Sequence, residues 1–314
     1  MLNEVVSIAR GVRDFFVHPP RVETHQKDGH ANFVTNVDID VQCQLEQALL
    51  KLLPGSALIG EEKRNQGLSD RPTWVVDPID GTTNFLRGRD YSSVSIALLE
   101  NQRPVLACVY QPFRDEVFTA ALNGGAFLNG QRIHVSEIAF ERALVGFGTA
   151  PYDTSLAESS MKLALRFLQH CADLRRTGSA ALDLAEVACG RQDVFFELCL
   201  SPWDIAAGAL LVQEAGGVFS MPLLEKPQFA QPAAVLASNQ RCAAEARELF
   251  CSFMKETAAP GQGGPSLNGQ ATCVFGQKPP QRPLYGCVIL CHGMQSCAAA
   301  KKQSSNARKG RSRP

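Results

Sequence analysis

The stretch Thr73-Trp74-Val75-Val76-Asp77-Pro78-Ile79-Asp80-Gly81-Thr82-Thr83-Asn84-Phe85 is the most informative part of this 314-residue chain. Its apolar residues 74–76 predict a strand, and two carboxylates follow directly at Asp77 and Asp80. Gly81 and two hydroxyl residues come next, as at a tight turn that presents backbone N–H groups. A hard divalent cation prefers several oxygen ligands, and a phosphate prefers such N–H groups. The stretch therefore predicts a metal-assisted phosphoryl-transfer site.

Two other interpretations of the same residues are open. Aspartate, proline, glycine and threonine also form ordinary turns after a strand, so the stretch alone does not decide a function. The Asp-x-Asp-Gly-Thr strand of haloacid dehalogenases is the nearest rival motif, and its first aspartate is a nucleophile. Here Pro78 and Ile79 separate Asp77 from Asp80, which changes the direction of the second carboxylate relative to the first. This spacing disfavours the dehalogenase interpretation.

Further carboxylates flank the motif at two places. Glu61 and Glu62 follow a short apolar strand at residues 57–59, although the basic residues after them also fit a solvated loop. Asp204 begins a long apolar run that ends at two glycines and predicts a buried helix, which Asp204 could also cap. Carboxylates close together repel one another and acquire raised pKa values unless a cation is present. An all-oxygen ligand set favours magnesium over zinc.

Together these segments resemble the inositol monophosphatase family. The first signature of that family is similar to residues 77–85, and the second to residues 203–208 with 214–217. Two further segments, Val34-Thr35-Asn36-Val37-Asp38 and Gly60-Glu61-Glu62, occur in the same order as in the family. The resemblance runs from about Leu2 to about Phe253. It implies the layered αβαβα sugar-phosphatase fold, which is α+β in its first half and α/β in its second.

The resemblance also implies a role for individual residues, with two to three Mg²⁺ ions as cofactor. The implied metal ligands are Glu61, Asp77, the carbonyl of Ile79, Asp80 and Asp204, with Glu62 supporting them from outside. Thr82, paired with Asp38, is expected to activate the attacking water. Substrate contacts are expected from Lys27, Asp80, Gly81, Thr82, Thr83, Gly178, Ser179, Ala180, Glu197 and Asp204.

The resemblance favours an inositol monophosphate as the substrate, because Glu197 lies before Trp203-Asp204 at the spacing of the inositol enzymes. Fructose 1,6-bisphosphate, histidinol phosphate, 3′-phosphoadenosine 5′-phosphate and NADP are alternatives within the family. Pro202 and Asn32 depart from the usual family residues. Lithium inhibition and a homodimer are implied by the resemblance alone. A distant alternative is a regulatory function. Some bacterial members of the family also bind the transcription machinery, and this chain could do the same.

Three segments are expected along the chain. Residues 1–140 should form an α+β half with the main motif, and residues 141–257 an α/β half with the second signature. Residues 258–314 contain eight basic and no acidic residues and are rich in Gly, Pro, Gln and Ser, which predicts a disordered tail. A role of this tail in nucleic-acid binding is only a weak alternative to a solvated tail.

Composition fits an enzyme of the cytoplasm. Glu4, Arg10 and Arg13 interrupt the beginning of the chain, so no signal peptide is expected there. No apolar run approaches the ~20 residues of a membrane span, and no membrane partner is expected. Amphipathic patterns predict single helices over residues 2–17 and 38–53.

Overall fold

The computed structural model describes residues 1–26, 33–62, 68 and 70–257, all of which belong to one compact unit. Three expectations lie outside these described residues, namely those for Lys27, for Asn32 and for the tail at 258–314. The division into halves at about residue 140 also stays a prediction, because this unit spans both halves.

A seven-stranded sheet forms the first half of the described chain, in the order β3-β4-β5-β6-β7-β8-β9. Only β3 and β4 run parallel, and each later neighbour is antiparallel. Its strands are β3 (Ala57–Gly60), β4 (Thr73–Asp80), β5 (Ser93–Glu100), β6 (Arg103–Gln111), β7 (Glu116–Ala121), β8 (Gly125–Leu128) and β9 (Gln131–Ile133). A separate antiparallel pair consists of β1 (Thr24–Gln26) and β2 (Phe33–Thr35).

A five-stranded mixed sheet forms the second half, in the order β11-β10-β12-β14-β13. Its strands are β10 (Leu144–Phe147), β11 (Asp173–Arg175), β12 (Val194–Leu200), β13 (Val218–Ser220) and β14 (Ala233–Ser238). The central strand β12 is parallel to β10 and antiparallel to β14.

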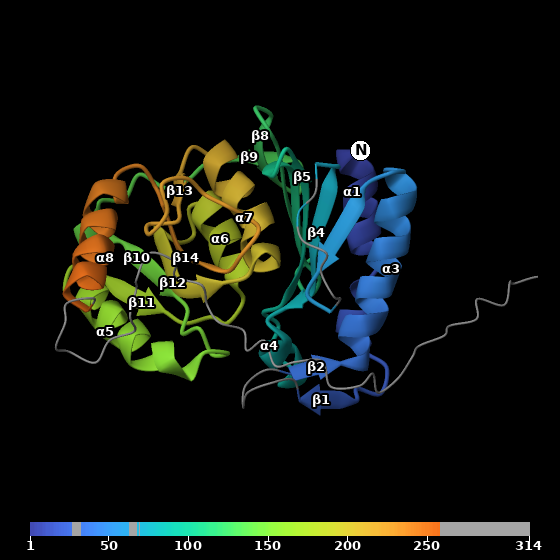
Figure 1. The fold of residues 1–314 in the computed structure, drawn as a ribbon, viewed down its shortest axis with the longest axis horizontal. Helices are drawn as coiled ribbons and strands as arrows, with labels where there is room; N and C mark the ends of the chain where they lie inside the picture. Colours follow the sequence, from blue (N-terminus) through green and yellow to red (C-terminus); the bar gives the residue numbers. More distant parts are fainter. Residues whose placement is uncertain (27–32, 63–67, 69, 258–314) are drawn as a thin grey trace, which may run out of the picture. The chain divides into compact units, whose positions relative to one another are not determined.

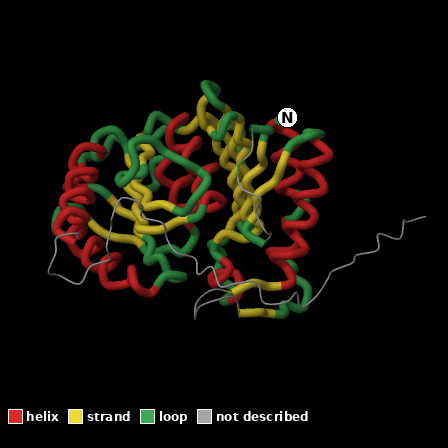
Figure 2. Tube along the Cα trace, viewed as in Figure 1, coloured by secondary structure: helices red, strands yellow, loops and turns green. Residues whose placement is uncertain are grey.

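Helices complete five layers (Figure 1). α1 (Leu2–Arg10) and α3 (Asn36–Leu52) cover one face of the seven-stranded sheet, and α6 (Ala180–Ala188) and α7 (Pro202–Glu214) lie between the sheets. α5 (Ala157–Leu168) and α8 (Ala243–Thr257) cover the outer face of the five-stranded sheet. Colouring by secondary structure shows the same alternation of helix and strand layers (Figure 2). The remaining helices are short: α2 (Arg13–Val17), α4 (Thr82–Leu86), η1 (Phe140–Arg142) and η2 (Thr154–Leu156).

Strand periodicity explains why three cores form. Successive side chains of a strand point to opposite faces, so a strand between two helix layers must be apolar on both faces. On β4, Trp74 and Val76 pack with α1 and α3, while Val75 packs with α6 and α7. On β12, Phe195 joins the core between the sheets, and Phe196 joins the outer core beneath α5 and α8.

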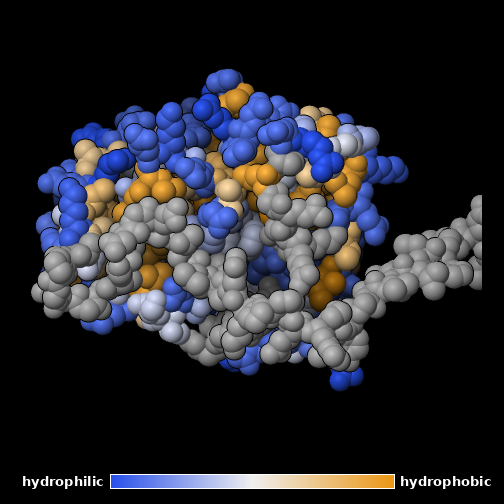
Figure 3. Space-filling view, in the orientation of Figure 1, coloured by the Kyte–Doolittle hydropathy of each residue, from blue (hydrophilic) through white to orange (hydrophobic). Residues whose placement is uncertain are grey.

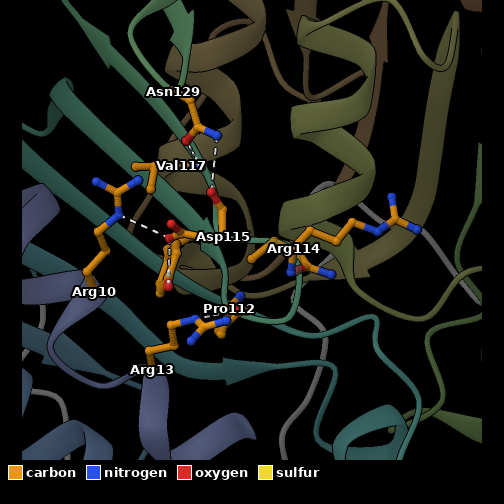
Figure 4. A network of polar contacts seen from close by, with 9 residues as sticks. Arg10, Arg13, Pro112, Arg114, Asp115, Val117 and Asn129 are labelled. Atoms are coloured by element: carbon orange, nitrogen blue, oxygen red, sulfur yellow. Dashed lines mark hydrogen bonds and ion pairs between the residues drawn. The ribbon is translucent and has the colours of Figure 1, made fainter.

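A polar network fastens the N-terminal helices to the turn between β6 and β7 (Figure 4). Arg10 Nε donates to Asp115 Oδ1 at 3.1 Å, and Arg13 Nε donates to the carbonyl of Pro112 at 3.0 Å. Asn129 Nδ2 donates to the carbonyl of Asp115 at 3.1 Å, which ties the same turn to the loop after β8. These contacts fix the outer helices without involving any residue of the cavity described below.

Two helix predictions need correction. The predicted helix over residues 2–17 is broken into α1 and α2, because the chain leaves helical geometry at Val12, the N-cap of α2. The helix predicted from Asp38 begins two residues earlier at Asn36, because Thr35 is its N-cap. The Thr35 hydroxyl accepts from the backbone N–H of Val37 and of Asp38, at 3.1 and 3.2 Å.

The described surface is mixed in character. On the face in Figure 3, hydrophilic residues lie beside smaller hydrophobic patches. Exposed apolar side chains on α5 include Met161 and Leu165, which are 56% and 57% exposed. Within the described residues, no helix combines the length and the apolar character that crossing a membrane requires.

Close packing of α6 against α7 depends on Gly208. A Cβ atom at this position would lie 2.5 Å from the Cβ and Cδ1 atoms of Leu184. We expect Gly208→Ala to lower the free energy of unfolding by about 1–3 kcal/mol, because the two helices must separate. The loss should occur although alanine favours a helix by about 1 kcal/mol over glycine. Thermal and urea unfolding would measure it.

Glu248→Ala is the control, because Glu248 lies on the exposed face of α8. Its effect should stay within about 0.5 kcal/mol. An unchanged or raised stability of Gly208→Ala would contradict the packing argument.

Candidate functional site

A bulge in β4 sets the direction of the two motif carboxylates. Asp77 pairs with Ser95 of β5 and Asp80 pairs with Ser93, so three steps on β4 match two steps on β5. Two residues on the same strand that are two positions apart share a face, so the bulge brings both aspartates to one face of the sheet. In a regular strand, residues three positions apart would point to opposite faces. The bulge is the structural consequence of the Pro78-Ile79 spacing.

Backbone donors hold both carboxylates in place. Asp77 is buried, and its Oδ1 accepts from the N–H of Ile79 at 2.9 Å. Asp80 Oδ2 accepts from the Ser179 hydroxyl and, at 2.9 Å, from the N–H of Ala181. Asp80 Oδ1 accepts from the N–H of Ala180 at 3.3 Å. The first turn of α6 therefore binds Asp80 with N–H groups that have no partner within the helix.

Asp204 reaches the same place from α7. Ser201 is the N-cap of this helix, which corrects the prediction that Asp204 could be the cap. Asp204 is instead the third helical residue, and its Oδ2 accepts from the N–H of Ser201 at 2.7 Å. This bond fixes the carboxylate, which faces inward although the residue as a whole is half-buried.

The structure brings Asp77, Asp80 and Asp204 together. Each offers a carboxylate oxygen, and these oxygens all lie within 4.8 Å of one another. Burial, followed by the charges of Glu61, Asp80, Asp204 and Asp38, raises the pKa of Asp77 well above its usual range. Burial, with the charges of Asp80 and Glu61, does the same to the pKa of Asp204.

These residues fit a hard divalent cation. The donors are carboxylate oxygens from both signatures, which is the ligand type that magnesium prefers. Without a cation, the neighbouring carboxylates disfavour one another's ionisation, which is why their pKa values are raised. A bound cation would remove this repulsion. The carbonyl of Ile79 lies in the same bulge and accepts from the Thr82 hydroxyl at 3.0 Å, which leaves it a second lone pair.

Glu61 and Glu62 follow β3 in a turn that α3 supports. The N–H of Glu62 donates to Gln42 Oε1 at 2.9 Å, and Gln42 packs where a Cβ atom on Gly60 would lie. Glu61 is half-buried and outside the three-carboxylate group, but its charge acts on both Asp77 and Asp204. Glu62 is also half-buried, and both side chains belong to a structured turn.

Asp38 and Thr82 meet as predicted from the sequence. The Thr82 hydroxyl lies 3.3 Å from Asp38 Oδ1. Asp38 Oδ2 accepts from the N–H and the hydroxyl of Thr35, at 2.7 and 2.5 Å. The capping box of α3 therefore fixes this buried carboxylate, and Thr82 is also buried.

A cavity of about 480 Å³ lies beside the carboxylates. Gly81, with a φ of +88°, turns the chain from β4 into α4, and a side chain there would meet the carbonyl of Gly178 at 3.0 Å. Thr82 and Thr83 follow in the first turn of α4, whose N–H groups have no acceptor within the helix. Most predicted substrate-binding residues line this cavity: Asp80, Gly81, Thr82, Thr83, Gly178, Ser179, Ala180, Glu197 and Asp204.

Glu197 is the buried carboxylate on the far wall. Its Oε1 accepts from the N–H of Ala150 at 2.8 Å, and a Cβ atom on Gly148 would lie 1.8 Å from its Oε2. Burial raises the pKa of Glu197 to about 7, although the Ala150 N–H and the charge of Arg176 oppose this shift. The side chain therefore fits only because residue 148 is a glycine.

Two residues that shape the cavity, Asn84 and Asp183, have no role among the sequence-based expectations. Asn84 Nδ2 donates to the carbonyls of Tyr91 and Thr177, at 2.8 and 3.0 Å, and thereby joins α4 to the loop before α6. Asp183, on α6, accepts from the Thr177 hydroxyl at 2.5 Å and from Gln192 Nε2 at 2.8 Å. A charged residue within the apolar stretch 180–188 is the sequence signal that could have identified Asp183.

Comparison with known proteins gives a consistent result. The family model described as the inositol monophosphatase family matches residues 5–255. The Nus factor SuhB of Escherichia coli K12 is 42% identical over 226 residues, which cover 70% of this chain and 84% of that protein. The inositol monophosphatase of Dictyostelium discoideum is 37% identical over 231 residues, covering 71% and 79%.

Solved structures agree with the five layers. An IMPase from Thermotoga maritima matches with a TM-score of 0.73 and 31% identity, covering 81% of this chain and 98% of that chain. The inositol monophosphatase of Anabaena matches with a TM-score of 0.70 and 29% identity, covering 80% and 95%. The fold that the sequence resemblance implied is thus confirmed.

The buried Asp183 should make stability depend on pH. Burial raises the pKa of Asp183 to about 8, compared with about 4 for an aspartate in an unfolded chain. Between those values the folded protein binds the extra proton, so this group lowers the free energy of unfolding as pH rises. We expect the melting temperature of Asp183→Asn relative to wild type to rise from about pH 5 to about pH 8.

Thermal unfolding of both proteins across this range measures the difference. Asp173→Asn is the matched control, because Asp173 is exposed and its contact with Arg175 lowers its pKa. The control should show no such rise. A constant difference between Asp183→Asn and wild type would contradict the buried, protonated state of Asp183.

Proposed function

The chain belongs to the inositol monophosphatase family, and from this premise we propose that it is a magnesium-dependent phosphate monoester hydrolase acting on an inositol monophosphate. The observation that supports this proposal is the meeting of Asp77, Asp80 and Asp204 beside a cavity large enough for a small phosphorylated polyol. Phosphate monoesters hydrolyse extremely slowly without catalysis. An enzyme that hydrolyses them is therefore expected to stabilise the negative charge of the phosphoryl group strongly.

Two to three Mg²⁺ ions are the proposed cofactor. Glu61, Asp77, the Ile79 carbonyl, Asp80 and Asp204 would hold them, with Glu62 as outer support. Bound magnesium lowers the pKa of a water and neutralises charge on phosphoryl oxygens. The chain's own part is to fix these ligands, which the bulge of β4 and the first turns of α6 and α7 do.

Asp38 and Thr82 are proposed to orient the attacking water. Asp38 is already fixed by two bonds from Thr35, and its other oxygen faces the Thr82 hydroxyl. When the Thr82 hydroxyl donates to Asp38, its oxygen lone pairs are free to accept a hydrogen bond from the attacking water and so to orient it. The N–H groups of Gly81 and Thr82 are proposed to bind phosphoryl oxygens, together with Lys27.

The polyol is proposed to lie between the α6 side and Glu197. The Glu197 carboxylate accepts hydrogen bonds and lines the cavity, as expected for a group that recognises hydroxyls. Gly178, Ser179, Ala180 and Thr83 would form the rest of this wall. The Ser179 hydroxyl and the Ala180 N–H already bond to Asp80, so their contribution is to hold Asp80 more than to bind substrate directly.

Other features are proposed from family membership alone. They are inhibition by lithium, a homodimer and a cytoplasmic location. Fructose 1,6-bisphosphate, histidinol phosphate, 3′-phosphoadenosine 5′-phosphate and NADP remain alternative substrates for the same residues.

A second function has one specific observation in its favour. The relative at 42% identity is named a Nus factor, which indicates a role in transcription for that protein. A binding role of this kind in our chain would use its surface and not the carboxylate cluster. A catalytically inactive variant that still restores the phenotype of a deletion strain would support this second function.

Asp77→Asn tests the proposed enzyme. We expect phosphate release from inositol 1-phosphate to fall at least about a hundredfold, because one of the carboxylates that would hold Mg²⁺ loses its charge. The measurement is phosphate release in Mg²⁺ with and without EDTA, over a panel of inositol 1-phosphate and the four alternative substrates.

Asp173→Asn is the control, because this exposed aspartate lies outside the cavity. It should keep wild-type activity. Activity of Asp77→Asn within tenfold of wild type, in a folded protein, would disprove the proposed metal site. Preference for another substrate would keep the chemistry and change the substrate, and wild-type inactivity on the whole panel would favour the transcription role.

A further inference from the structure

The loop between β10 and η2 forms a wall of the cavity that no sequence motif covers. Gly148, Thr149, Pro151 and Tyr152 all line the cavity. Tyr152 is the one residue of this group with an aromatic ring and a hydroxyl at its tip. The loop therefore adds a hydrogen-bonding group to the cavity.

Hydrogen bonds fix this loop at both ends. The N–H of Gly148 donates to the carbonyl of Phe196 at 2.9 Å, and the N–H of Ala150 donates to Glu197 Oε1 at 2.8 Å. The N–H of Asp153 donates to the carbonyl of Ala150 at 2.9 Å, which closes a turn around Tyr152. The loop and Glu197 are thus joined by hydrogen bonds into one unit.

Backbone strain shows that the surroundings determine the loop's conformation. Ala150 has a φ of +44°, a left-handed conformation that is unfavourable for any residue with a Cβ. Such conformations cost about 1–3 kcal/mol and persist where neighbouring contacts hold them, often at ligand-binding sites. Here the bond from Ala150 to Glu197 is the contact that holds it.

Tyr152 lines the same cavity as Asp80 and Asp204. A tyrosine hydroxyl is protonated at neutral pH, so it can donate a hydrogen bond there. The residue as a whole is 49% exposed, so it is accessible where it lines the cavity. Within the described part of the chain, no hydrogen-bond partner engages this hydroxyl.

We propose that Tyr152 is a specificity-determining residue whose hydroxyl donates a hydrogen bond to a hydroxyl group of the alcohol part of the substrate. This inference rests on the proposed phosphatase function. The donor on Tyr152 and the acceptor on Glu197 belong to one hydrogen-bonded unit, so together they match a substrate that carries several hydroxyls. A phosphate monoester without such hydroxyls gains nothing from the contact.

Tyr152→Phe tests the inference with two substrates. For inositol 1-phosphate, kcat/KM should fall about five- to tenfold, as expected for loss of one uncharged hydrogen bond. For phenyl phosphate, whose alcohol part has no further hydroxyl, kcat/KM should stay within about twofold of wild type. The loss should appear mainly in KM, because the contact is made to the bound substrate.

Tyr110→Phe is the matched control. Its hydroxyl donates to Asp115 Oδ1 at 3.0 Å, and Tyr110 is not among the residues that line the cavity. It should leave both substrates unaffected. Equal losses on both substrates would show that Tyr152 contacts the phosphate or the metal site, and no loss on either would show that it contacts nothing; both results overturn the inference.

A binding measurement separates this inference from the proposed function. Calorimetry measures the Kd of inositol 1-phosphate in the presence of Mg²⁺ for Asp38→Asn, in which turnover should be blocked. The same measurement on Asp38→Asn/Tyr152→Phe shows what the second substitution adds. The added substitution should raise Kd about five- to tenfold. Equal affinities overturn the role of Tyr152 alone. If wild type hydrolyses neither substrate and Asp38→Asn binds none, the proposed function fails and this inference fails with it.

Discussion

Repulsion among Asp77, Asp80 and Asp204 is the constraint on which the rest of the structure depends. Carboxylate oxygens within 4.8 Å of one another, in a buried place, oppose their own ionisation. The fold sustains them with backbone donors from the bulge of β4 and from the first turns of α6 and α7. Because these elements belong to two neighbouring layers, the cluster exists only when the seven-stranded sheet and the middle helices are packed together.

Close packing beside buried carboxylates accounts for two of the three glycines that line the cavity, Gly81 and Gly148. Gly81 lets the chain leave β4 directly after Asp80, so that the first turn of α4 faces the cluster. Gly148 leaves room for the Glu197 carboxylate, which would otherwise meet a side chain at 1.8 Å. A glycine loses more conformational entropy on folding than other residues do. At both positions this cost is offset by the space that the missing side chain leaves beside buried carboxylates.

Sequence reasoning located the site better than it located the ends of the elements. The motif carboxylates could be predicted because short motifs contain them, and the resemblance to the family implied the pairing of Asp38 with Thr82. The extension of β4 to Asp80 could not, because Pro78 usually ends a strand and only pairing with β5 reveals a bulge. The exposed strand β1 lacks any apolar pattern. The positions of Tyr152 and Asp183 at the cavity could not be predicted, because tertiary contacts, and not local periodicity, bring them there.

The bond from Asn84 to the carbonyl of Thr177 has a further consequence for kinetics. The side-chain amide of Asn84, on α4, donates both to the carbonyl of Thr177 in the loop before α6 and to the carbonyl of Tyr91. It therefore joins segments on two sides of the cavity. Opening the cavity at this point would leave the Asn84 amide and the carbonyls of Tyr91 and Thr177, all of them at least partly buried, without these partners. This part of the cavity is therefore preorganised, and a ligand enters a space whose shape exists before encounter. Association should then be governed by diffusion and orientation, with no slow conformational step at this end of the cavity.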